Sequence, residues 1–176
     1  MTRNILLAGF GGQGILFAGK VMAYAGLIEN KEISWLPSYG PEMRGGTANC
    51  SVCISDDPIG SPLVLTPDIL VAMNLPSYDK FIDAAAPGAT VVVDSTLVGK
   101  VSERTDINAF YIPATKLAGD NGLKGLANII IIGKLLKETS FASPESVEAA
   151  IRKCVPAKKA AMVDFNLKAL KLGMDC

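Results

Sequence analysis

The pattern of apolar and polar residues at the start of the chain predicts a strand, a loop, a helix and a second strand. Residues 4–8 form a short apolar run typical of a buried strand, and residues 9–14 form a glycine-rich loop. Apolar residues then recur along residues 15–28 as expected of a helix. Residues 32–36 follow as a strand, and residues 37–46, rich in glycine and proline, form a second loop.

Strands and helices alternate through the middle of the chain. In residues 48–55 apolar positions alternate with polar ones, which indicates a strand with one buried face near an edge of the sheet. Residues 68–73 and 89–93 are short apolar runs typical of central parallel strands, and a helix is predicted between them at residues 76–86. Residues 109–112 form a further strand.

The carboxyl-terminal third is predicted to be helical, over residues 123–137, 143–154 and 157–172. Ser143 suits the N-cap of the second of these helices, and Pro144 suits its first position. Strands that alternate with helices predict an α/β, Rossmann-like fold with a mostly parallel sheet and helices on both faces. A length of 176 residues fits one domain, residues 1–176, whose core needs no disulfides.

Composition narrows the classes of function. Lys plus Arg and Asp plus Glu both total 17, so no global field draws the chain to nucleic acid or to an anionic membrane. The sequence contains no histidine, which removes the commonest general base and most zinc sites. The apolar start is too short for a signal peptide, and no apolar stretch approaches the roughly 20 residues of a membrane span. We therefore expect a soluble, cytoplasmic protein.

Two further features of the composition bear on partners and metals. Apolar residues make up 49% of the chain and charges are few, which favours an obligate partner surface.

Cys50 and Cys53 have the C-x-x-C spacing, yet strand alternation assigns their thiols to opposite faces, and no second pair lies at zinc-ligand spacing. We expect four free thiols, no bound metal and no iron-sulfur cluster held by this chain.

The motif G-x-G-x-x-G occupies residues 9–14, directly after a predicted strand and before a predicted helix. Glycines allow a sharp turn and a close backbone approach, while free amides and the positive end of the helix dipole attract phosphate. A phosphate-bearing ligand is therefore the favoured interpretation. A purely structural turn is the alternative.

The loop after the second predicted strand is another candidate for ligand binding. An NAD site places an acid at the carboxyl end of that strand, but Glu32 opens the strand. The far end, residues 37–39, carries no acid, which disfavours NAD. Arg44 lies between flexible glycine hinges and suits a phosphate or a carboxylate. The alternative is a solvated loop in which Arg44 forms a salt bridge.

These two segments resemble the gamma subunit family of 2-oxoacid:ferredoxin oxidoreductases, whose members act on pyruvate, 2-oxoisovalerate, 2-oxoglutarate or indolepyruvate. The resemblance covers residues 5–14, Ile-Leu-Leu-Ala-Gly-Phe-Gly-Gly-Gln-Gly. A second and more specific match covers residues 35–48, Trp-Leu-Pro-Ser-Tyr-Gly-Pro-Glu-Met-Arg-Gly-Gly-Thr-Ala. It continues through residues 54–56, 59–62 and 72–78 and so spans nearly the whole chain.

The resemblance implies a subunit that helps to hold coenzyme A and is not catalytic alone. Partner alpha, beta and delta subunits would bind thiamine diphosphate and carry iron-sulfur clusters. The complex would convert a 2-oxoacid to an acyl-CoA, with electrons passing to ferredoxin. On this basis the residues expected to bind the coenzyme belong to the glycine loop and a facing rim: Gly9, Gly11, Gly12, Gln13, Gly14, Ser38, Tyr39 and Arg44.

Several other polar residues have two interpretations each. Asn74 and Asp94 each end an apolar strand, where they could line a pocket or, more simply, cap a turn or helix. Lys20 could reach a phosphate bound at the glycine loop or be a solvated helix lysine. For the whole chain, a stand-alone nucleotide-binding enzyme and a non-catalytic scaffold are the alternative functions.

Overall fold

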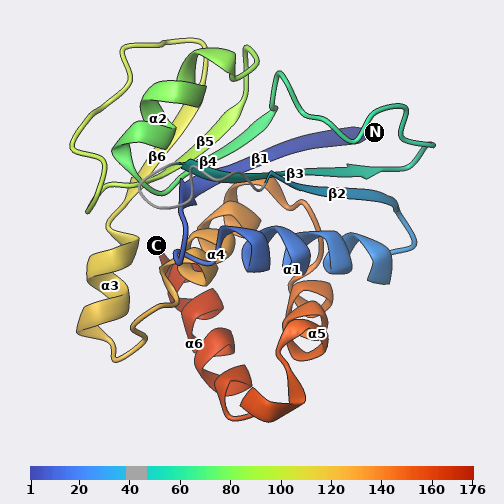
Figure 1. Ribbon diagram of the computed structural model, residues 1–176, viewed down its shortest axis with the longest axis vertical. Coiled ribbons are helices and arrows are strands. Elements are labelled where there is room, and N and C mark those ends of the chain that lie inside the picture. Colours follow the sequence, from blue (N-terminus) through green and yellow to red (C-terminus); the bar gives the residue numbers. More distant parts are fainter. Residues whose placement is uncertain (39–46) are drawn as a thin grey trace.

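A six-stranded, mostly parallel sheet forms the centre of the computed structural model, which describes residues 1–38 and 47–176 (Figure 1). The strands run across the sheet in the order β2-β3-β1-β4-β5-β6. β3 is antiparallel to both of its neighbours, whereas β1, β4, β5 and β6 pair in parallel. The strand bounds are β1 Thr2–Phe10, β2 Glu32–Ser38, β3 Thr47–Ser55, β4 Ile69–Ala72, β5 Thr90–Asp94 and β6 Asn108–Ile112.

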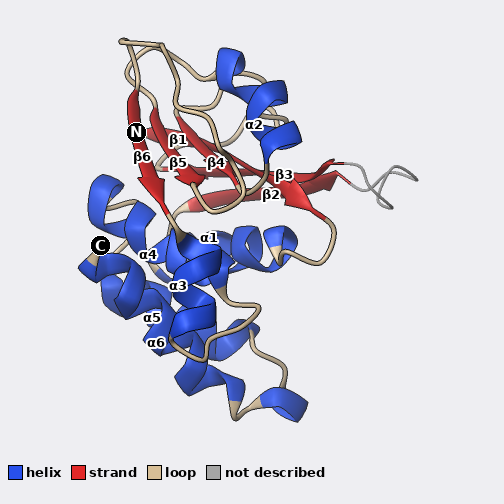
Figure 2. Ribbon diagram, turned by 90° about the vertical axis from the view of Figure 1, so that its left-hand side faces the viewer, coloured by secondary structure: helices blue, strands red, loops and turns tan. Residues whose placement is uncertain are grey.

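Helices cover both faces of this sheet, which confirms the predicted fold class. Figure 2 shows α2 on one face, with α1 and α4 to α6 on the other. The helix bounds are α1 Ile15–Ile28, α2 Leu75–Phe81, α3 Ala114–Asp120, α4 Ala127–Thr139, α5 Pro144–Cys154 and α6 Met162–Asp175, with short 3₁₀ turns at η2 Ile82–Ala84 and η3 Ala157–Lys159. Within the described ranges, no helix combines the length and the apolar character that crossing a membrane demands.

The central strands are apolar without alternation because both of their faces are covered. In β5, Val92 packs into the core shared with α1 and α4, while Val91 and Val93 pack into the core beneath α2. A strand buried on two sides has no polar face to present to solvent. The apolar runs at residues 68–73 and 89–93 were therefore correctly predicted as central parallel strands.

One expectation for β3 is wrong, because both of its faces are buried rather than one. The strand does lie next to an edge strand, β2, and its two thiols do point to opposite faces: Cys50 into the core under α1, Cys53 into the second core. The chain that follows β3 covers its polar positions. The hydroxyl of Ser51, for example, accepts the backbone N–H of Val64 at 3.2 Å. A small polar side chain satisfied in this way does not mark a solvent face.

Several element boundaries differ from the prediction. The helix α3 lies in a stretch that the apolar pattern left unassigned. α4 begins at Ala127 rather than residue 123, because Gly125 has a φ of 86°, which interrupts a right-handed helix. The predicted helix at residues 157–172 is divided between η3 and α6, and α6 continues past Gly173.

Helices α4 and α6 cross with their backbones in contact. A Cβ atom built on Gly133 of α4 would overlap the carbonyl oxygen of Leu170, and one built on Gly173 of α6 would overlap the carbonyl oxygen of Ile130. Only glycine fits at either position, and the lack of a side chain there allows α6 to approach α4 this closely.

Candidate functional site

The glycine loop turns sharply between the end of β1 and the start of α1. Gly9 belongs to β1, and the backbone N–H of Gln13 donates to the carbonyl of Phe10 at 3.2 Å. Gly12 and Gly14 have φ values of 91° and 73°, in the left-handed region that side chains disfavour. The motif therefore uses Gly12 and Gly14 for backbone conformation, as predicted.

Gln13 braces this loop against the neighbouring strand. Its Oε1 accepts the backbone N–H of Phe10 at 2.6 Å, and its Nε2 donates to the carbonyl oxygen of Met73, just beyond β4, at 3.0 Å. Both ends of the amide are thus engaged inside the chain. The coenzyme contact expected of Gln13 remains a prediction, and its side chain has a structural role that the sequence did not indicate.

The first turn of α1 has no side-chain cap and contains no acidic residue. The carbonyl of Gly14, at the N-cap, accepts the side-chain Nδ2 of Asn128 at 3.0 Å and the N–H of Ala18 at 2.9 Å. The first N–H groups of a helix have no partner inside it, and they carry the positive end of its dipole. This end of α1 is therefore suited to an anion.

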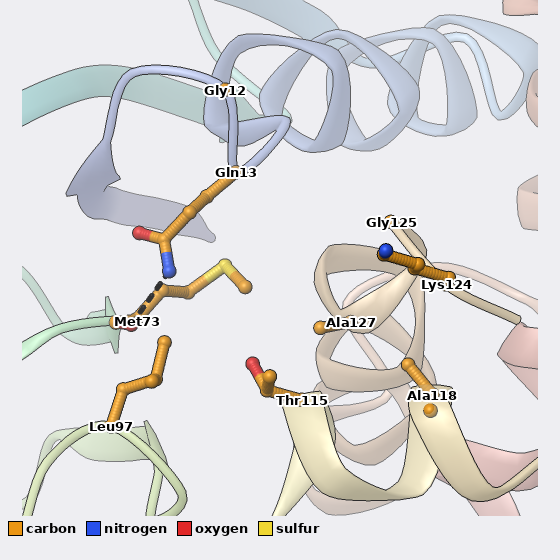
Figure 3. Close-up of a pocket in the computed structure, with 10 residues that line it drawn as sticks. Gly12, Gln13, Met73, Leu97, Thr115, Ala118, Lys124, Gly125 and Ala127 are labelled. Atoms are coloured by element: carbon orange, nitrogen blue, oxygen red, sulfur yellow. Dashed lines mark hydrogen bonds between the residues drawn. The ribbon is translucent and has the colours of Figure 1, made fainter.

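A cavity of about 410 Å³ opens beside the loop at the carboxyl ends of the parallel strands. Figure 3 shows its walls: Gln13, Met73 and Leu97 lie on one side of the open space, and Thr115, Ala118, Lys124 and Ala127 lie on the other. The neighbouring strands β1 and β4 are followed by helices on opposite faces of the sheet, α1 after β1 and α2 after β4, so a crevice opens between their carboxyl ends. Ligands of open α/β sheets bind at such a switch point.

The walls of this cavity are mostly apolar, with few polar groups. Lys124 contributes a cation and Thr115 a hydroxyl, while Gly12 and Gly125 contribute backbone only. A volume of about 410 Å³ lies within the range of ligand pockets, about 300–1,000 Å³. The far side of the glycine loop adjoins a second hollow of about 260 Å³, which extends over Ala48 of β3.

The structure brings some of the predicted site residues together and leaves others apart. Gly11, Gly12, Gln13 and Gly14 lie together at the start of α1, and Gly9 leads into them. Ser38 ends β2 and is exposed; it pairs with Asn49, which pairs with Ala8, so it lies two strands from the loop. At about 4.8 Å per strand this is roughly 10 Å. Tyr39 and Arg44 lie outside the described residues.

Asn74 and Asp94 serve as caps, the simpler of their two interpretations. Asn74 Oδ1 accepts the N–H of Ser77 at 2.8 Å in the first turn of α2. Asp94 Oδ1 accepts the N–H of Thr96 at 3.1 Å after β5. The ammonium of Lys20 lies 5.8 Å from the centre of the Tyr24 ring, one turn towards the carboxyl end of α1 from Lys20 and so away from the loop.

The sequence interpretation missed the other side of the cavity, formed by Thr115, Ala118, Lys124 and Ala127. One signal was available. Gly122 and Gly125 precede α4 with φ values of 68° and 86°, so a second glycine-bearing turn leads into another helix without a side-chain cap. The sequence of α3 has no comparable feature that would have indicated a pocket.

The cysteines lie apart from this cavity. All four are in the described part of the chain, and none of them forms a disulfide. Burial raises the pKa of the Cys50 thiol to about 12, and burial also raises the pKa of Cys53, helped by the charge of Asp68. In the two described stretches, no three His, Cys, Asp or Glu side chains gather as metal ligands would.

Comparison with known proteins identifies a family. Residues 4–176 match the family model described as pyruvate ferredoxin/flavodoxin oxidoreductase. The 2-oxoglutarate synthase subunit KorC of Methanocaldococcus jannaschii is 44% identical over 160 residues, which cover 89% of this chain and 85% of KorC. The ketoisovalerate oxidoreductase subunit VorA of Methanothermobacter thermautotrophicus is 40% identical over 173 residues, which cover 98% of this chain. The chain spans only 36% of the length of VorA.

Solved structures share the fold. The gamma subunit of a keto/oxoacid ferredoxin oxidoreductase from Geobacter sulfurreducens superposes with a TM-score of 0.84 at 31% identity, covering 98% of this chain and 96% of that one. A 2-oxoglutarate:ferredoxin oxidoreductase from Magnetococcus marinus, solved with 2-oxoglutarate, coenzyme A and succinyl-CoA bound, superposes with a TM-score of 0.88 at 24% identity. The match covers 99% of this chain and 30% of that one, and at this identity it supports the fold alone.

Proposed function

The chain belongs to the pyruvate ferredoxin/flavodoxin oxidoreductase family, and from this we propose that it is the gamma-type subunit of a multi-subunit 2-oxoacid:ferredoxin oxidoreductase. The complex would decarboxylate a 2-oxoacid oxidatively, join the acyl group to coenzyme A, and pass the electrons to ferredoxin. Thiamine diphosphate and iron-sulfur clusters would reside in partner alpha, beta and delta subunits.

This chain's own part is to bind the pyrophosphate of coenzyme A. The observation that carries this proposal is the start of α1, which has neither a side-chain cap nor an acid and borders a cavity. Backbone N–H groups at such a helix end can donate to phosphate oxygens, and the dipole favours the negative charge. Gly11, Gly12 and Gly14 supply the backbone, and Lys124 adds a cation on the opposite wall.

The catalytic steps would fall to the partners, because the chain carries little acid-base machinery. It contains no histidine, and burial raises the pKa of Cys50, Cys53 and Cys154, which keeps these thiols protonated. The alternative of a stand-alone NAD enzyme is disfavoured by Glu32. This acid lies at the first residue of β2, at the opposite end of that strand from the ligand edge of the sheet.

The glycine loop can be tested with one substitution and a matched control. Gly12 and Gly88 have φ values of 91° and 81°, and a Cβ on either meets no heavy atom within 4 Å. Alanine at either position therefore costs about 1–2 kcal/mol of backbone strain and nothing in packing. Only Gly12→Ala alters the cavity wall.

In the assembled complex we expect Gly12→Ala to raise the KM for coenzyme A by about 10- to 100-fold, which corresponds to the loss of about one charge-assisted hydrogen bond. Gly88→Ala should leave this KM unchanged. Steady-state kinetics with varied coenzyme A, with thermal unfolding as a check on folding, make the comparison. Equal KM values in the two variants would contradict the proposal.

A further inference from the structure

Asp94 is a buried carboxylate that forms no salt bridge with the part of the chain that the structure describes. It ends β5, and its side chain is 0% exposed. Its charge is met by hydrogen-bond donors instead. Oδ1 accepts the N–H of Thr96 at 3.1 Å; Oδ2 accepts the N–H of Thr115 at 3.2 Å and the hydroxyl of Thr115 at 2.5 Å.

This arrangement fixes the direction of the Thr115 hydroxyl. A carboxylate can only accept hydrogen bonds, so the hydroxyl of Thr115 donates its proton to Asp94 Oδ2, beside the backbone N–H groups that both oxygens also accept. A hydroxyl whose proton is committed offers only its lone pairs to another group. Thr115 lines the cavity, so there it acts as a hydrogen-bond acceptor (Figure 3).

Among the side chains that line the cavity in the described part of the chain, Thr115 carries the only hydroxyl. The Gln13 amide uses Oε1 and Nε2 within the chain, and Lys124 can only donate. The remaining lining side chains are apolar or absent. The Thr115 hydroxyl thus places an accepting oxygen amid apolar side chains, near a cation and the uncapped start of α1.

We propose that Thr115, oriented by Asp94, accepts a hydrogen bond from an N–H group on an apolar segment of the ligand whose phosphate lies at the start of α1. This inference rests on the proposed function and assigns the cavity to a defined part of the coenzyme. Coenzyme A has two segments of this chemistry, the amides of its pantetheine arm and the amino group of its adenine. Thr115 contacts the ligand, and Asp94 is a positioning residue that acts through it.

The test uses two substitutions at Thr115 in the assembled complex. Thr115→Val keeps the branched shape but removes the acceptor, whereas Thr115→Ser keeps the hydroxyl. We expect Thr115→Val to raise the KM for coenzyme A about 3- to 10-fold, as for one lost neutral hydrogen bond, with kcat unchanged. Thr115→Ser should restore the wild-type KM. Asp94→Asn should also raise the KM, because an asparagine Nδ2 in place of Oδ2 cannot accept the hydroxyl proton, and the Thr115 hydroxyl would lose its fixed direction.

Two fragments of the coenzyme identify which N–H is recognised. Adenosine 3′,5′-bisphosphate carries the adenine amino group, and 4′-phosphopantetheine carries the amides. The inhibition constant of one fragment against coenzyme A should rise 3- to 10-fold in Thr115→Val, and that of the other should stay unchanged.

Failure of this inference can be told apart from failure of the proposed function. If Gly12→Ala raises the KM for coenzyme A while Thr115→Val leaves the KM and both inhibition constants within twofold of wild type, Thr115 is not an acceptor for the ligand and the glycine-loop site stands. If neither substitution changes the KM, the proposed coenzyme site fails as well. Thermal unfolding of each variant shows whether a loss reflects folding instead. If Thr115→Val folds poorly, Asp94→Asn, which leaves the Thr115 side chain in place, provides the comparison with wild type.

Discussion

At the scale of single residues, the Gln13 amide is the contact that joins the glycine loop to the next strand of the sheet. Replacing it with leucine removes the hydrogen bonds to Phe10 and Met73 and leaves two backbone groups without their partner. We expect Gln13→Leu to lower the free energy of unfolding by about 1–2 kcal/mol. Urea unfolding followed by circular dichroism measures the change.

A surface amide provides the control for Gln13. Asn121 donates from Nδ2 to the carbonyl of Leu117 at 2.9 Å and is exposed. Substitution of Asn121 by leucine should change the free energy of unfolding by no more than about 0.5 kcal/mol. If Gln13→Leu is equally mild, the brace contributes little to stability and the turn of the loop depends on its glycines alone.

The residues also differ in how far their roles could be read from the sequence. Gly12 and Gly14 were predictable, since a glycine between a strand and a helix has few other uses. The bracing role of Gln13 was not, because it depends on Met73, 60 positions away, which only the parallel pairing of β1 with β4 brings close. Thr115 was missed for the same reason: it lies in α3, and its role depends on Asp94 at the end of β5, 21 positions away.

At the scale of elements, the crossing of α4 and α6 depends on two glycines. Alanine at Gly133 or Gly173 would force the helices apart, because each methyl would overlap a backbone carbonyl of the facing helix. We expect each substitution to lower the free energy of unfolding by about 1–3 kcal/mol or more, as overpacking of a core does. Thermal or urea unfolding tests this.

Gly119 of α3 is the matched control for the crossing glycines. It is also helical, but a Cβ there meets no heavy atom within 4 Å. Gly119→Ala should therefore raise the free energy of unfolding by roughly 0.5–1 kcal/mol, because alanine favours the helix and restricts the unfolded chain. A similar loss of stability in all three variants would show that close contact is not the cause.

The elements themselves were predicted best where local chemistry decides them. The bounds of α1 were predicted at residues 15–28 and are Ile15–Ile28, because the glycine loop ends where side chains with helical spacing begin. α3 was missed because a helix of 7 residues holds too few turns to establish a period. The two buried faces of β3 depend on a later loop folding over it, which its own alternation does not reveal.

At the scale of the whole molecule, the cavity joins segments that are distant in sequence. Its walls come from the loop after β1, the ends of β4 and β5, α3, and the turn before α4. The first of these segments, the loop after β1, could be predicted from the sequence, because strand-loop-helix is a local pattern. The others meet it only because parallel strands share one edge for their carboxyl ends, so they follow from topology.

Because its thiols are buried, the whole molecule should become less stable as the pH rises into the alkaline range. Burial raises the pKa of Cys50 to about 12, whereas a thiol in the unfolded chain ionises near pH 8.5. A group whose pKa is higher in the folded state contributes stability that is complete below the unfolded pKa and is lost as pH rises towards the folded value. Above about pH 8.5, Cys50 alone should therefore reduce the free energy of unfolding by up to about 1.4 kcal/mol per pH unit.

Removing the Cys50 thiol isolates this contribution. Cys50→Ala leaves a small void, which lowers stability at neutral pH, but its urea midpoint should fall less steeply than that of wild type between pH 8.5 and 10.5, because one proton fewer is released on unfolding. Cys176→Ala, at an exposed position, should keep the wild-type slope. The comparison needs unfolding curves at four or five pH values in a reducing buffer. Parallel slopes for wild type and Cys50→Ala would mean that the Cys50 thiol is not protected by the fold, and the close packing of α1 on β3 would then need revision.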